Sequence, residues 1–381
     1  LVTTTELEPL IPVGHEIAYE QFRLPIEPGE RTFATGGPAL KVSAEGNELT
    51  ASSSKVNFVF DKKTGLVSSY KVGGTEYFKD GFGLQPNFWR APNDNDYGNG
   101  NPKRLQVWKQ SSKNFNVVDA NIVMDGKDAV LTANYLLAAG NLYIVTYRIS
   151  PSGVVKADFT FTSTDMEATK TEASEATLMA TFTPGSDAAR KAASKLEVPR
   201  IGVRFRLPAE MNQVEYFGRG PEENYIDRNA GTLIDLYKTT ADQMYFPYVR
   251  PQENGHHTDT RWLTLNKKGG KGLTIYADKT IGFNALRNSV EDFDGEETVS
   301  RPYQWLNRDA GELVHDESKA KDQLPRKTHI NDITPRNFVE VCVDMKQQGV
   351  AGYNSWGARP EPGYNIPANQ EYKWGFTIVP R

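Results

Sequence analysis

The chain has 381 residues, enough for two or three domains or for one large all-β domain with a companion. Its formal charge is -4, from 44 Lys plus Arg against 48 Asp plus Glu, and it has no basic run suited to a phosphate backbone, so composition argues against a nucleic-acid partner. No segment has the ~18 consecutive apolar residues that a membrane helix needs, so we expect a soluble protein without membrane contact.

The N-terminal segment is followed by a stretch rich in Pro, Gly and Thr, residues 25–39, which marks a domain boundary. Residues 1–24 include the strand-like "HEIAYEQFRL" but are too few to bury a core alone. We therefore predict that residues 1–35 are the tail of a truncated domain plus a linker, cut from something longer, and that residues 36–381 form the main domain. The tail is expected to be disordered or to lie on the surface of that domain.

Strand-like alternation of β-branched and aromatic residues dominates the rest of the chain. Turn signals such as "DKKTGLV" and "NKKGGKG" separate these runs at spacings typical of β-sandwiches. Antiparallel sheets are therefore predicted. The clearest strands are expected at residues 55–61, 141–150, 154–164, 200–208, 272–278 and 371–380.

Two further features interrupt or accompany the strands. Residues 183–199 are expected to connect two halves of the sheet assembly, and within them "SDAARKAASKL", residues 186–196, is predicted to form a short surface helix or loop. The single cysteine, Cys342 in "FVEVCVDM", has no partner for an intrachain disulfide, and its apolar surroundings predict a buried, inert thiol.

A cluster of carboxylates in "FGRGPEENYIDRNAG", residues 217–231, could belong to a glycosidase active site or could only stabilise a turn. A retaining glycosidase needs two carboxyl groups ~5 to 5.5 Å apart, and an inverting one ~6.5 to 9.5 Å. The adjacent Glu222 and Glu223 would point to opposite faces of an extended chain, and "GRGP" marks a turn. With Asp227, Arg219 and Arg228 nearby, we favour the reading in which these groups satisfy the turn and each other.

A second dense stretch is "FWRAPNDNDYGNGNP", residues 88–102. Asp94 and Asp96 are spaced as at the start of a calcium loop, but the Gly and the distal Glu of an EF-hand are out of register. We predict a turn built by Asn and Asp side chains, followed by a mobile surface loop of the kind from which binding lids are made.

A third stretch, "PYVRPQENGHHTDTRWL", places His256 and His257 beside Glu253 and Asp259. Neighbouring histidines on a strand diverge, so a zinc site is not favoured. A general acid or base role for one histidine is open.

The last constellation is "GVAGYNSWG", residues 349–357. Its glycines allow close backbone approach, and Tyr353, Asn354 and Trp356 place aromatic faces beside an amide, which suits the apolar and hydroxyl faces of a sugar. A core role for Trp356 is the alternative. The sequence has no nucleophile elbow, P-loop, dinucleotide fingerprint or cysteine-rich metal motif.

Taken in their order along the chain, these four stretches resemble the C-terminal or small-chain domain of the β-galactosidases of glycoside hydrolase family 2. Residues 1–30 resemble the end of the immunoglobulin-like domain that precedes it in that family. The resemblance implies an all-β fold, a large antiparallel β-sandwich of the galactose-mutarotase-like (supersandwich) type. It also implies that the catalytic glutamates lie in a barrel domain absent from this chain, so that Glu222 and Glu223 are structural.

By resemblance, this domain supplies one wall of a sugar-binding pocket, and Trp356 matches the residue that stacks on the sugar. Asn354 and Tyr353 stand beside it, where the family commonly has acidic residues, so the substrate preference could differ. Gly98 and Asn99 match a loop near the pocket mouth. The substrate-binding residues predicted are therefore Trp356, Asn354, Tyr353, Gly98 and Asn99, with no catalytic residue and no metal ligand in the chain.

The resemblance implies further expectations about partners. The partners expected are a galactoside substrate and the missing barrel domain, and the full-length enzyme is expected to be homo-oligomeric. No cofactor is expected in this chain, although a divalent or sodium ion would be compatible with the full-length enzyme. The compartment is open between bacterial cytoplasm and periplasm.

Two alternatives from other classes remain at this stage. One is a stand-alone carbohydrate-binding module. The other is a mutarotase-like epimerase with His256 or His257 as acid and Glu253 as base, which is suggested by fold type alone.

Overall fold

The computed structural model describes residues 1–26, 29, 31–162, 197–294, 306–307, 312–313, 329–354 and 356–381. The chain divides into two compact units, Leu1–Phe33 and Ala34–Arg381. In the first unit, β1 (Val2–Thr3) pairs antiparallel with β2 (Glu16–Ala18). The strand expected over residues 15–24 is thus only three residues long, and all three are exposed, so no core extends it. That this unit is the tail of another domain stays a prediction.

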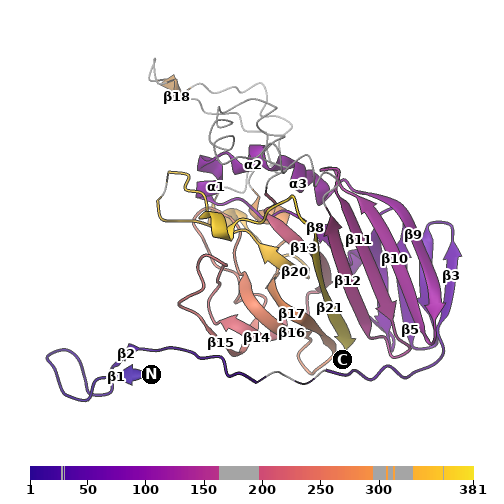
Figure 1. The fold of residues 1–381 in the computed structure, drawn as a ribbon, viewed down its shortest axis with the longest axis horizontal. Coiled ribbons are helices and arrows are strands. Elements are labelled where there is room, and N and C mark those ends of the chain that lie inside the picture. Colours follow the sequence, from indigo (N-terminus) through magenta and orange to yellow (C-terminus); the bar gives the residue numbers. More distant parts are fainter. Residues whose placement is uncertain are drawn as a thin grey trace. The chain divides into compact units, whose positions relative to one another are not determined.

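Twelve strands of the second unit form one antiparallel sheet among the residues that the structure describes (Figure 1). Its main path runs β15 (Leu233–Thr240), β14 (Gln213–Gly220), β16 (His257–Asn266), β17 (Gly272–Leu286), β21 (Tyr372–Pro380), β12 (Val155–Thr162), β11 (Leu142–Ile149), β10 (Asp128–Leu136) and β9 (Asn116–Asp125). Off this path, β20 (Phe338–Gln347) pairs with β17 and with β13 (Arg200–Pro208), and β13 also pairs with β8 (Gln85–Asn87).

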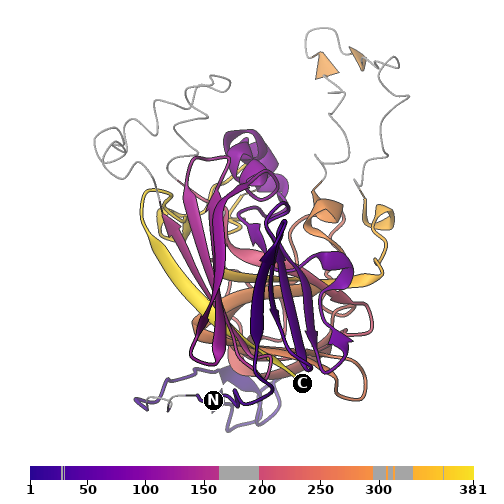
Figure 2. The same cartoon turned by 90° about the vertical axis from the view of Figure 1, so that its right-hand side faces the viewer.

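A second, five-stranded antiparallel sheet packs against the β9 to β12 part of the large sheet (Figure 2). It consists of β3 (Lys41–Glu45), β4 (Glu48–Ser52), β5 (Val56–Asp61), β6 (Leu66–Val72) and β7 (Thr75–Glu76). Aromatic rings interlock between the sheets, with Phe58 5.6 Å from Tyr147 and Phe60 6.4 Å from Tyr135 between centroids. The Tyr135 hydroxyl donates to the Gly65 carbonyl (2.9 Å), which satisfies its buried polar end. The predicted sandwich is therefore present.

The strands differ in how many of their faces are buried, and this explains which strands the sequence pattern predicts and where charged residues enter the interior. β10, β11 and β12 alternate between buried and partly exposed residues, as the period-two pattern predicts. β13 and β20 are instead buried on both faces along most of their length, and they carry charged side chains into the interior. Cys342 on β20 is buried as expected, and burial raises the pKa of its thiol well above the ordinary value.

Short helices lie at one end of the large sheet, beside the segment that follows β20 (Figure 1). They are α1 (Asp94–Gly98), α2 (Asn101–Arg104) and α3 (Gln106–Ser111). The remaining short elements are η1 (Lys79–Gly81), α7 (Val290–Phe293), β18 (Leu306–Asn307), β19 (Glu312–Leu313), η3 (Ile330–Asp332) and η4 (Pro362–Tyr364). The helix or loop expected at residues 186–196, and most of the connection expected at 183–199, lie outside the described residues.

Candidate functional site

The candidate site centres on an aromatic loop, residues 349–357, of which the structure describes all but residue 355. Trp356 is 90% exposed and Tyr353 is 70% exposed, although a large aromatic side chain is ordinarily buried. The Trp356 N–H donates to the Asn354 Oδ1 (2.9 Å), so Asn354 shapes the loop backbone. Ala351 adopts a left-handed backbone with φ 58°, which turns the chain sharply. Both aromatic rings are therefore presented to solvent.

Helix α1 forms the second part of the site, in place of the predicted turn and mobile loop. Asn93 is its N-cap: the Asn93 side chain accepts from the Asp96 N–H (2.8 Å), and the Asp96 carboxylate accepts from the Asn93 N–H (2.9 Å). This reciprocal capping box satisfies two backbone donors and starts a helix. The predicted turn is instead this helix: Gly98 is its last residue, and Asn99 and Gly100 form the turn that leads into α2, which begins at Asn101.

The structure brings two of the stretches singled out in the sequence, residues 88–102 and 349–357, into contact. A Cβ placed on Gly98 would lie 2.7 Å from the Gly357 Cα, so the two backbones are in direct contact. The Gly357 N–H donates to the Asn95 Oδ1 (3.2 Å), and the Asn99 amide donates to the Ala358 carbonyl (3.4 Å). Gly98 and Asn99 thus support the loop that carries Tyr353, Asn354 and Trp356, and whether any of them binds a sugar stays a prediction.

Asp227 anchors the other end of the aromatic loop, a role that sequence reasoning missed. Its two carboxylate oxygens accept from the backbone N–H groups of Val350 (3.0 Å) and Ala351 (2.8 Å). The Asn93 amide donates to the Val350 carbonyl (2.9 Å). The only signal in the sequence was an acidic residue within the carboxylate cluster, and nothing local linked it to a loop more than a hundred residues later.

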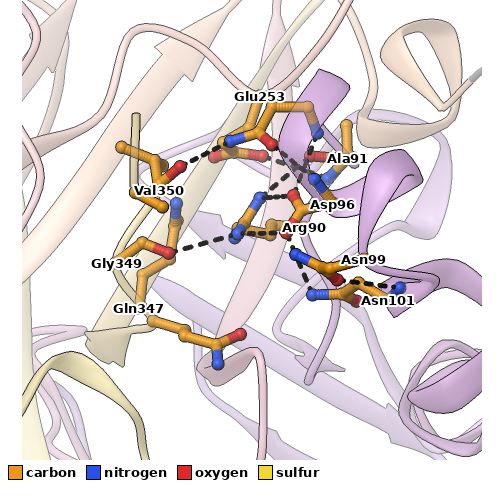
Figure 3. Close-up of polar contacts among 12 residues, drawn as sticks. Arg90, Ala91, Asp96, Asn99, Asn101, Glu253, Gln347, Gly349 and Val350 are labelled. Carbon is orange, nitrogen blue, oxygen red and sulfur yellow. Dashed lines mark hydrogen bonds and ion pairs between the residues drawn. The ribbon is translucent and has the colours of Figure 1, made fainter. Parts of the chain in front are cut away.

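A buried polar cluster underlies both segments (Figure 3). Arg90 forms a buried ion pair with Asp96, and its guanidinium also donates to the Gly349 carbonyl (3.3 Å). The Asn101 amide donates to the Asp96 Oδ1 (3.0 Å), which also accepts from the Arg90 guanidinium (3.1 Å). Because Arg90, Asp96 and Asn101 are nearly inaccessible to solvent, these bonds link α1, α2 and the aromatic loop to the sandwich interior.

Behind this cluster, Arg200 on β13 shares its charge between two buried carboxylates. Its guanidinium lies 2.6 Å from the Glu253 carboxylate and 3.2 Å from that of Asp344. The second Glu253 oxygen accepts from the Ala91 N–H (3.3 Å), next to Arg90. Burial raises the pKa of Asp344 to about 7: loss of hydration outweighs the attraction of Arg200, and the charge of Glu253 adds to the rise.

Of the two carboxylates in the "GRGPEEN" turn, that of Glu223 has structural partners. Glu223 accepts from the Gly255 N–H (2.7 Å), from the Arg228 guanidinium (2.7 Å) and from the Tyr248 hydroxyl. Glu222 is exposed at the surface. These contacts agree with the structural role that the resemblance implies for the turn.

The two histidines of the third stretch are buried. Burial lowers the pKa of His256 well below its ordinary value, and burial also lowers the pKa of His257. The His257 ring nitrogens lie within hydrogen-bond distance of the Gly255 carbonyl (3.0 Å) and the Pro221 carbonyl (3.2 Å). Among the residues that the structure describes, no group of three or more His, Cys, Asp or Glu side chains is arranged to hold a metal ion.

Comparison with known proteins assigns the chain to a family. The family model described as "Beta galactosidase small chain" matches residues 52–378. The chain belongs to this β-galactosidase small-chain family. The predicted fold class, all-β with a large antiparallel β-sandwich, is confirmed by the two sheets.

Two curated relatives show the extent of the match. The chain is 30% identical over 369 residues to a β-galactosidase of Priestia megaterium, a match that covers 96% of this chain and 30% of the relative. It is also 30% identical over 272 residues to a β-galactosidase of Kluyveromyces lactis, covering 70% of this chain and 24% of the relative. The chain thus spans 30% or less of the length of these two β-galactosidases.

Solved structures with a similar course of the chain include two enzymes of Lactobacillus acidophilus. A galactose mutarotase related enzyme has a TM-score of 0.39 and 9% identity, covering 88% of this chain and 97% of its own. A galactose 1-epimerase has a TM-score of 0.38 and 6% identity, covering 90% of this chain and 98% of its own.

Proposed function

We propose that this chain is the accessory domain of a β-galactosidase and that it forms one wall of the pocket in which terminal β-D-galactosides are hydrolysed. The observation that carries the proposal is the exposure of Trp356, 90%, on a loop whose two ends are bonded to the sandwich. An aromatic ring held in solvent is poised to cover the apolar face of a pyranose, and this contact would bury its surface.

In this proposal the catalytic carboxylates lie outside the chain. Glu223 and Asp227 are bonded to neighbouring side chains and backbone, and Glu253 is buried against Arg200. A glycosidase needs two carboxyl groups that face a common bond in an accessible cleft. The first test is hydrolysis of a chromogenic β-galactoside by the isolated chain against a no-protein control. No turnover is expected, and turnover above the control would overturn the proposal.

The second test concerns the wall itself. In the longer enzyme that we propose contains this chain, Trp356→Ala should raise KM for the galactoside several-fold, since one stacking contact is worth about 1 kcal/mol. Trp356→Phe, which keeps a smaller ring, should have a smaller effect. Phe217→Ala on β14 removes another partly exposed ring and serves as the matched control. Equal KM values for Trp356→Ala and the control would contradict the wall assignment.

A carbohydrate-binding module is the alternative that the exposed ring also permits. A pocket wall and a binding module differ in the affinity of the isolated chain for a sugar, because a single wall encloses too little of the sugar to bind it well. Calorimetric titration with galactose and with lactose separates them. Saturable binding at millimolar sugar or tighter, abolished by Trp356→Ala, would favour the module.

The epimerase alternative receives less support from the geometry. His256, His257 and Glu253 are all buried, and Glu253 is paired with Arg200, so none of them faces solvent where a free sugar could meet it. The optical rotation of fresh α-galactose should therefore decay at the same rate with the chain as in buffer.

The proposal extends to the partners of the longer enzyme. We propose a galactoside and a barrel domain as partners, a homo-oligomeric enzyme, and no cofactor bound by this chain. No helix in the described part of the chain has the length and the apolar character that crossing a membrane requires.

A further inference from the structure

The turn that carries Asp227 is held rigidly by the sandwich. The backbones of Tyr225 and Arg228 exchange two hydrogen bonds (3.2 and 2.8 Å), which places Asp227 at the tip between them. The Tyr225 ring stacks on His256 with centroids 5.6 Å apart. Next to it, the Asn224 side chain accepts from the Thr258 N–H (2.9 Å) at the start of β16. The carboxylate is therefore presented from a fixed support.

We propose that Asp227 is the positioning residue of the aromatic loop. By fixing the backbone at Val350 and Ala351, it sets the place from which Tyr353 and Trp356 project. The "GRGPEENYIDR" motif would then contribute to substrate recognition through the backbone of another loop rather than through chemistry of its own carboxylates.

The loop needs such an anchor because its own conformation is unfavourable. Ala351 has φ 58°, in the left-handed region that residues with a Cβ rarely adopt, and Gly352 follows with φ 122°. Hydrogen bonds to a charged acceptor stabilise both amides and hold the left-handed turn in place. At the far end, Gly357 rests on α1. Anchoring the loop at both ends lowers the entropic cost of presenting the two rings.

Gly349 provides an independent test of the contact between the Asp227 carboxylate and the Val350 and Ala351 amides. A Cβ on Gly349 would lie 2.4 Å from the Asp227 Oδ2, while its φ is not in the left-handed region. Gly349→Ala should therefore displace the carboxylate without changing any charge. Gly363 is the matched control, because a Cβ there would meet nothing within 4 Å and its backbone is equally compatible with Ala.

The experiment is hydrogen exchange of the Val350 and Ala351 amides in the 381-residue chain. Asp227→Ala should raise their exchange rates by about tenfold or more, as expected when a hydrogen bond to a charged group is lost. Asp227→Asn keeps one carbonyl acceptor and should give a smaller rise, and Gly349→Ala should act in the same direction. Asp235→Ala is the control, since that exposed carboxylate accepts from the N–H of its own neighbour Leu236 and lies on β15, outside the aromatic loop.

Unchanged exchange in Asp227→Ala and in Gly349→Ala would overturn the proposal. The thermal midpoint is measured in parallel, and if Asp227→Ala does not fold, Asp227→Asn and Gly349→Ala decide alone. A rise spread over the whole chain, rather than confined to the loop, would also overturn it, because a positioning role acts locally.

The consequence for substrate rests on the proposed function and has a separate readout. In the longer enzyme, Asp227→Asn should raise KM more than it lowers kcat. Combined with Trp356→Ala, Asp227→Asn should raise KM little further, because both substitutions act through the Trp356 ring. If loop exchange rises but Trp356→Ala leaves KM unchanged, the proposed wall fails while the positioning role of Asp227 stands.

Discussion

Gly98 at the end of α1 and Gly357 at the end of the aromatic loop touch through their backbones, with room for a side chain on neither. A Cβ on Gly98 would lie 2.7 Å from the Gly357 Cα, and a Cβ on Gly357 would lie 2.6 Å from the Gly98 carbonyl carbon. The two residues are separated by most of the chain. Their contact joins the segment that follows β8 to the segment that follows β20.

Gly98→Ala should separate these segments. The new methyl group meets rigid backbone rather than the end of a flexible side chain, so one segment must move, at a cost of about 1–3 kcal/mol in the free energy of unfolding. Urea denaturation of the chain measures this loss. Gly231→Ala is the control, because a Cβ there meets nothing within 4 Å. Similar losses in both variants would show that the contact is not close in solution.

Asn93 has two separable roles in the same region. Its carbonyl oxygen caps α1, and its amide donates to the Val350 carbonyl (2.9 Å). Asn93→Ser keeps a capping oxygen and loses the amide donor without adding a charge, whereas Asn93→Ala loses both and should cost about 1 kcal/mol more. Thermal or urea unfolding of the two variants gives the difference. If Asn93→Ser were as destabilised as Asn93→Ala, the cap would contribute nothing.

The strands could be predicted from sequence because one face of each is buried. In β10, β11 and β12 the alternation of apolar and polar residues reflects burial that is local to the strand. Helix α1 was missed because Asn93, Asp94 and Asp96 are equally typical of turns, and only the capping geometry distinguishes a helix start.

The aromatic loop was found through residue types and family resemblance, but its supports were not. Asp227 and Val350 are 123 residues apart in the chain, and no local pattern links a turn carboxylate to a distant backbone amide. The buried charges were also missed. Arg200, Glu253 and Asp344 come from three separate segments, and charged residues in a strand ordinarily predict an exposed face.

Removing Arg200 should destabilise the chain strongly. Arg200→Met leaves the Glu253 and Asp344 carboxylates buried without their counter-charge, which is expected to cost about 3–5 kcal/mol in the free energy of unfolding. The matched control is Arg148→Met, which breaks an exposed ion pair with Asp125 and should cost about 0–1 kcal/mol. Urea unfolding near neutral pH compares the two, and equal losses would mean that the buried charges are better hydrated than the structure indicates.

Asp344→Asn should change how stability depends on pH. Burial raises the pKa of Asp344 from 3.8 to about 7, so between these values the folded chain keeps a proton that the unfolded chain has released. The stabilisation from this group is therefore complete below about pH 4 and is lost as the pH rises towards 7. The Asn variant has no such loss.

The groups that face Asp344 make the comparison with a variant necessary. Arg200 and Glu253 are charged neighbours, and the His256 ring lies 3.7 Å from the carboxylate. Burial lowers the pKa of His256, so its contribution has the opposite sign: it is present above about pH 6.5 and is lost as the pH falls. Both proteins contain His256, and their difference isolates Asp344. Urea unfolding at pH 5 and pH 8 should show the wild-type chain losing stability relative to Asp344→Asn at the higher pH. A difference that stays constant between the two pH values would mean that Asp344 is already ionised at pH 5 in the folded chain.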